Sequence, residues 1–307
     1  MVLSALVVRK TSSYLTFVPK KEKVQLSCLL LPYCFVILSA LVVRKMSSYL
    51  IFIPMQDLKA LLDQKHLQYN RPDFVADDPI SIPHLFSQKE DIEIAGFLAA
   101  LIAWGKRNLI IRSATRLMEA MEYAPFHFVK DASETDLEKM CTFVHRTMNA
   151  TDVVAIVLAL RNVYANQDGL EGIFKVENIE NKAFHAINQA RSLLLSAEDF
   201  PARTHKHIAS PLAGSSAKRI NMYLRWMVRK DNAGVDFGLW NSLSPADLIC
   251  PLDVHTGNVG RKLGLLSRTQ NDWKAAVELT ESLRQFCAED PVKYDFALFG
   301  IGVNQEI

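Results

Sequence analysis

Apolar residues recur at intervals of three and four along most of the chain beyond residue 54, a spacing that predicts amphipathic helices. Pro79 and Pro83 interrupt this pattern and predict a loop. No run of alternating apolar and polar residues between 55 and 200 predicts a strand, so we expect an all-α architecture. The expected helices in this part cover residues 56–68, 90–104, 107–122, 135–145, an almost entirely apolar segment capped by Thr151, and 180–196.

A basic helix is expected to begin near Ser216, and its two faces differ. Its core-facing positions, by helical spacing, are Ile220, Tyr223, Leu224, Met227 and Val228. Lys218, Arg225 and Arg229 line a stripe roughly opposite. From residue 200 to 230 there are seven Lys and Arg residues and no Asp or Glu. The stripe is interpreted either as an ordinary solvated face or as a surface for phosphates.

The turn that precedes this helix, PLAGSSA at 211–217, consists of small residues. Such a turn presents backbone N–H groups at a helix start, where the helix dipole favours an anion. Together with the basic stripe it would hold a nucleic-acid backbone without reading bases.

Further along, Asp253 stands where a helix N-cap belongs, and the dipole there favours an ionised carboxylate. Ser244 and Pro245 predict a short turn before it. Asn271 and the Asp290-Pro291 pair are expected to begin the two closing helices.

The first 54 residues contain a repeat: residues 3–19 recur at 38–54 with 14 of 17 positions identical. Two copies do not build a solenoid, so the repeat indicates a duplication of DNA rather than a packed unit. We expect translation to begin naturally at Met55. The alternatives are a signal peptide or a membrane segment over 24–43, which holds 20 uncharged residues between basic flanks.

Charge and cysteine content narrow the function classes. The net charge of +2 is the sum of two opposite contributions. Residues 1–54 carry a net charge of +6, and the remaining 28 basic and 32 acidic residues give −4. A nucleic-acid partner must therefore be argued from a local patch. The five cysteines form no CxxC pair, which argues against a disulfide framework, a zinc site or an iron–sulfur cluster and fits a reducing cytoplasm.

The residues of 210–265 resemble a known superfamily. Leu212, Gly214 and Lys218 fall on the helix-hairpin-helix signature LPGVGxKTA of base-excision DNA glycosylases, and PLDVHTGNVGRKLGL at 251–265 resembles PVDTHVxRVxxRLGL of the endonuclease III and adenine glycosylase relatives. Ser216 replaces the second glycine of the hairpin. The interval of 35 residues from Lys218 to Asp253 is similar to that of the archaeal 8-oxoguanine glycosylases. The chain from Met55 onward also resembles a bacterial family of unknown function.

This resemblance to the helix-hairpin-helix (HhH-GPD) superfamily implies a two-lobed helical fold over 55–307 with the hairpin at the interlobe cleft. It implies an N-glycosylase that removes a damaged base, such as an oxidised purine, from duplex DNA, with or without AP-lyase activity. Asp253 would then be the catalytic aspartate and Lys218 the Schiff-base lysine. No cofactor is implied, and we expect a monomer.

The other site residues follow from these roles. Contacts to DNA are expected from Gly214, Ser215, Ser216, Arg219, Arg225, Arg229 and His255, and a base-stacking surface from Trp226 or Trp240, with Trp104 as a further choice. Two alternatives stay open. One is a non-catalytic helix-hairpin-helix module that binds nucleic acid. The other is a metal site built from His205, His207, Asp253 and His255.

Overall fold

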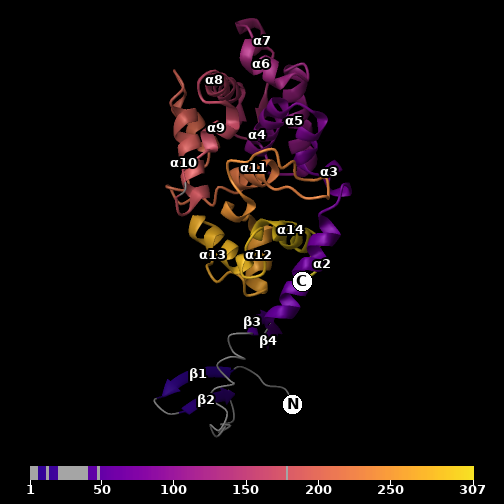
Figure 1. Cartoon of the computed structure of the whole chain (residues 1–307), viewed down its shortest axis with the longest axis vertical. Coiled ribbons are helices and arrows are strands. Elements are labelled where there is room, and N and C mark those ends of the chain that lie inside the picture. Colours follow the sequence, from indigo (N-terminus) through magenta and orange to yellow (C-terminus); the bar gives the residue numbers. More distant parts are fainter. Residues whose placement is uncertain (1–5, 12–13, 20–40, 47–48, 178) are drawn as a thin grey trace.

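The computed structural model describes residues 6–11, 14–19, 41–46, 49–177 and 179–307, and it is mostly helical, which confirms the expected all-α class (Figure 1). The α-helices are α2 (Met55–Tyr69), α3 (Asp73–Ala76), α4 (Lys89–Leu101), α5 (Arg107–Ala120), α6 (Pro125–Asp131), α7 (Glu134–Glu138), α8 (Ala150–Asn166), α9 (Gly169–Phe174), α10 (Lys182–Leu195), α11 (Lys218–Val228), α12 (Val254–Lys262), α13 (Trp273–Arg284) and α14 (Asp295–Val303). The 3₁₀ helices are η1 (Pro79–Ser81), η2 (Pro83–Leu85), η3 (Ala202–His207), η4 (Pro245–Asp247) and η5 (Pro291–Tyr294).

Helix starts and stops agree well with the sequence pattern, with one clear error. The helix expected over 135–145 is only the short α7, and the chain then turns into a small hairpin of strands β5 (Val144–His145) and β6 (Met148–Asn149). Helix α8 is capped by Asn149 through a capping box with Asp152, two residues earlier than expected. Helices α6 and α9 were not predicted because each is too short to show a helical period.

The two copies of the N-terminal repeat have the same secondary structure. Strands β1 (Leu6–Thr11) and β2 (Tyr14–Pro19) form one antiparallel hairpin, and β3 (Leu41–Met46) and β4 (Tyr49–Pro54) form another in the same register. The alternative membrane segment at 24–43 lies outside the described residues except for its last three. Among the described residues, no helix is both long and apolar enough to cross a membrane.

The helices beyond residue 54 gather in two groups with α11 between them (Figure 1). One group contains α4, α5, α6, α8, α9 and α10, and the other contains α2, α12, α13 and α14. Helix α4 is the centre of the first group, because its residues 92–101 are all buried and it packs on α11. This arrangement places the N-terminus of α11 and the N-terminus of α12 at the junction of the two groups.

Candidate functional site

A cavity of about 770 Å³ lies at this junction. Its wall combines the end of the α4–α5 loop, the hairpin before α11, the start of α12 and the inner face of α14. Of the residues predicted to form the site, Ser215, Ser216, Lys218, Arg219, Arg225, Asp253 and His255 line it. A cavity of this size is ample for a nucleobase with its sugar.

Lys218 and Asp253 meet in the wall of this cavity. Lys218 Nζ lies 3.5 Å from Asp253 Oδ2, and both side chains are partly exposed to the cavity. The carboxylate is also the predicted cap, because Asp253 Oδ1 accepts the backbone N–H of Thr256 at 2.9 Å. The cap fixes one oxygen of Asp253 and leaves the other facing the amine. The 35-residue connector therefore does bring the two groups together.

The hairpin at 210–217 is a tight turn whose amides are largely used internally. Gly214, at φ 83°, donates its N–H to the Pro211 carbonyl at 2.8 Å, and Ser215 donates to the Ser210 carbonyl at 3.1 Å. The expectation that Gly214 and Ser215 offer free N–H groups to a phosphate is therefore wrong. The hydroxyl of Ser216 donates to the Leu252 carbonyl at 3.4 Å, so this residue ties the hairpin to the segment carrying Asp253.

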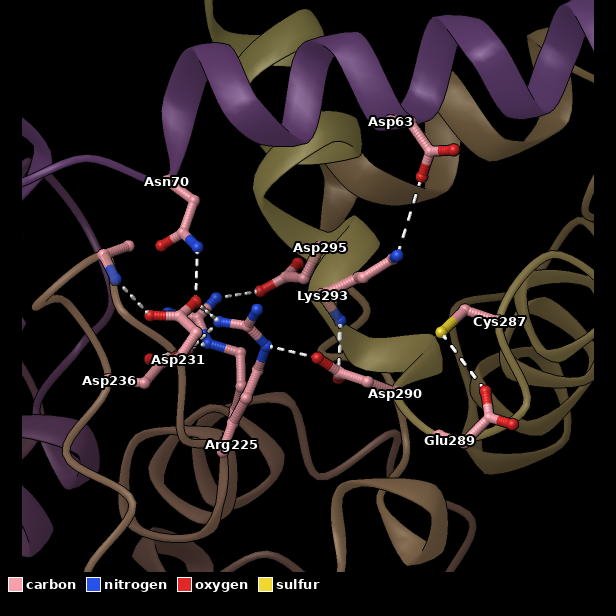
Figure 2. A network of polar contacts seen from close by, with 12 residues as sticks. Asp63, Asn70, Arg225, Asp231, Asp236, Cys287, Glu289, Asp290, Lys293 and Asp295 are labelled. Atoms are coloured by element: carbon pink, nitrogen blue, oxygen red, sulfur yellow. Dashed lines mark hydrogen bonds and ion pairs between the residues drawn. The ribbon is translucent and has the colours of Figure 1, made fainter.

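Arg225 and Arg229 do not form a solvent-facing stripe. Their side chains are 4% and 2% exposed, and both form ion pairs with aspartates. Figure 2 shows the network that contains Arg225. Arg225 contacts Asp236 at 3.2 Å and Asp295 at 2.5 Å. Arg229 contacts Asp231, Asp236 and Asp290. Helical spacing predicted where these residues lie on α11, but these aspartates, which come from other segments, cover that face.

Arg219 is also occupied within the fold. Its guanidinium donates to the carbonyls of Leu101 and His207, the latter at 3.2 Å, and lies over the Trp104 ring at 4.7 Å. Burial lowers the pKa of Arg219 to about 10. The predicted contact of Arg219 with DNA is corrected to a structural role in the wall of the cavity.

The two tryptophans expected to stack on a base are core residues. Trp226 is fully buried, and Trp240 is 2% exposed and donates its indole N–H to Glu93 at 2.6 Å. Neither lines the cavity. Trp104 does line it and stacks against His207 with ring centroids 6.0 Å apart. Trp104 is thus the one of the three that a base in the cavity could reach.

The alternative metal site is not assembled. His207 Nε2 lies 3.4 Å from Asp152, whereas Asp253 pairs with Lys218 and the exposed His255 packs edge-on against Phe299. In the described part of the chain, no three His, Cys, Asp or Glu side chains are grouped as metal ligands.

Two functional features were missed from the sequence. Asp295, on α14, lines the cavity, and burial raises its pKa to about 6, a rise that Arg225 opposes. Asn271, expected to be a helix cap, instead donates to the backbone carbonyl of Asp253 at 3.1 Å, and Asp272 caps α13. No local sequence signal predicts the Asn271 contact, because it joins residues 18 positions apart.

A family described as a protein of unknown function (DUF2400) matches residues 78–304 of this chain. Because the match covers most of the sequence, the chain belongs to that family. This confirms the expectation of a family without an assigned function. Searches of curated proteins and of solved structures gave no match.

Proposed function

We propose that the protein is a DNA-repair-type N-glycosylase that removes a damaged base, such as an oxidised purine, and then acts as an AP lyase. The observation that carries the proposal is the 3.5 Å approach of Lys218 Nζ to Asp253 Oδ2 in the wall of the cavity. The order of hairpin, lysine, long connector and capped aspartate, which resembles that of the glycosylases, supports it. The two groups of helices would correspond to the two lobes of the HhH-GPD fold.

The chemistry requires a nucleotide that has left the duplex, because the bond from C1′ to the base is inaccessible inside the helix. Positive charge then develops on the sugar as that bond breaks. The fixed carboxylate of Asp253 stabilises this charge without reorganising, since the Thr256 N–H already holds one of its oxygens.

Lys218 supplies the nucleophile in this scheme. Its deprotonated amine forms a bond to C1′ while the base departs with the bonding electrons and takes up a proton. The departing base takes one of the two amine protons. The ring oxygen takes the other as the sugar ring opens, which gives an imine between Lys218 and the sugar. Removal of a C2′ proton then expels the 3′ phosphate by β-elimination, and water releases the enzyme.

A single-turnover assay on duplexes that each carry one lesion tests this proposal. The wild type is expected to release the base from at least one oxidised-purine duplex. Asp253→Asn should slow release by about 10²- to 10³-fold, since the developing charge loses its stabilising carboxylate. Lys218→Ala should abolish strand cleavage.

The matched control is Lys230→Ala, which removes an exposed lysine just after α11 and outside the cavity. This control should leave both rates unchanged. Binding to DNA without base release from any lesion would overturn the proposal and favour a non-catalytic helix-hairpin-helix module.

A further inference from the structure

The cations that the sequence places on α11 leave little positive charge for a phosphate backbone. Arg225 and Arg229 are paired with aspartates, and Arg219 is bound to two backbone carbonyls. Lys218 faces Asp253. A protein that holds DNA across this cavity needs exposed positive charge from another segment.

Three cations meet this requirement where the α4–α5 loop reaches the cavity. Lys106 and Arg107 follow Gly105 directly, and Gly105 and Arg107 line the cavity. Arg146, in the β5–β6 turn, lies across the same glycine, because a Cβ on Gly105 would stand 2.6 Å from Arg146 Nη1. Lys106 and Arg146 are exposed, and Arg107 is half-buried with its guanidinium over the Phe299 ring at 4.8 Å. We call these three residues the rim cations.

The rim cations have no acidic partner in the part of the chain that the structure describes. None of the three forms an ion pair with a described carboxylate, unlike Arg225 and Arg229. Their charge is therefore available to a ligand.

The position of Arg146 is held by buried packing. The preceding residue, His145, lies with Nδ1 2.9 Å from Ser113 Oγ and with its ring 5.2 Å from that of Trp104. Arg146 itself adopts a φ of 54°, a left-handed conformation that costs a non-glycine residue free energy. The anchored hairpin thus holds the guanidinium at the cavity rim in spite of local strain.

We propose that the rim cations bind the phosphate backbone of duplex DNA on the α4–α5 side of the cavity. This rests on the proposed function and adds to it the surface that holds the substrate. Contacts of this kind carry no base specificity and place the duplex so that a nucleotide can enter the cavity. They release counterions, so they must appear in the salt dependence of binding.

Fluorescence anisotropy with a labelled duplex, measured over a series of salt concentrations, tests this inference. The Lys106→Ala/Arg146→Ala double variant should weaken binding at low salt by about tenfold or more. The negative slope of the logarithm of the association constant against log salt should become shallower by about 2. The control variant Lys130→Ala/Lys175→Ala also removes two exposed cations that form no ion pair with a described carboxylate, but away from the cavity, and should keep the wild-type slope.

Equal slopes in the two double variants, or no binding by the wild type, would overturn the inference. Circular dichroism must show wild-type folding for both variants, and Arg146→Gln alone should reduce the slope by about 1. Rim-dependent binding without base release leaves the inference standing while the glycosylase proposal fails. Base release together with DNA binding that does not depend on the rim cations would overturn the inference and leave the glycosylase proposal standing.

Discussion

At the scale of single residues, Asp253 shows how a helix cap can leave one carboxylate oxygen free to face a lysine in the wall of a cavity. One carboxylate oxygen is fixed by the Thr256 N–H, the other faces Lys218, and Asn271 holds the backbone carbonyl. The cap was predictable because N-caps leave a local signal in the sequence. The Asn271 contact was not, since it depends on how two loops meet. Ser216 likewise gains its role only from the tertiary approach of Leu252.

A pH-dependent contribution to stability is expected from His145. Burial lowers the pKa of this histidine, so folding favours the neutral imidazole. The unfolded histidine titrates near about pH 6.5, so this stability is fully present above that pH and is lost as the pH falls through the lower pKa of the folded state.

The His145→Asn variant tests this prediction, because asparagine retains a hydrogen-bonding group toward Ser113. Urea unfolding should show a destabilised variant at pH 7.5 and a clearly smaller difference from the wild type at pH 5. An equal difference at the two pH values would contradict the assignment.

At the scale of elements, α11 is buried on every side from Ile220 to Val228. The helix and its apolar face were predictable from the three- and four-residue spacing. The burial of its charged face was not, because Asp231, Asp236, Asp290 and Asp295 lie in segments that only the fold brings to it. A basic stripe in a sequence looks the same whether it faces solvent or a set of buried carboxylates.

Removal of Arg225 should therefore destabilise the protein strongly. The Arg225→Ala variant leaves Asp236 and Asp295 buried without this partner, and breaking a buried pair in this way costs about 3–5 kcal/mol. The free energy of unfolding in urea measures the loss. Lys139→Ala, which breaks only exposed pairs with Glu122 and Asp136, should leave the unfolding midpoint unchanged. Similar unfolding midpoints for the two variants would contradict a stabilising role of the ion pairs around Arg225.

At the scale of the whole molecule, the two groups of helices meet around one cavity, and α11 and α12 each direct an N-terminus toward it. The wall formed by the hairpin, Lys218 and Asp253 was predictable from the sequence of residues 210–265. The opposite wall was not, apart from Trp104, because Gly105, Arg107 and Asp295 belong to segments with no motif of their own. Strand β5, which directly precedes Arg146, was even predicted as the end of a helix.

The most direct test of the central claim is borohydride trapping, since reduction converts an imine between enzyme and sugar into a stable bond. The wild type, incubated with a duplex containing an abasic site or 8-oxoguanine, is expected to give a covalent adduct that peptide mass spectrometry places on Lys218. Lys230→Ala should give the same adduct and Lys218→Ala none. No adduct on either substrate, or an adduct on another lysine, would contradict the account.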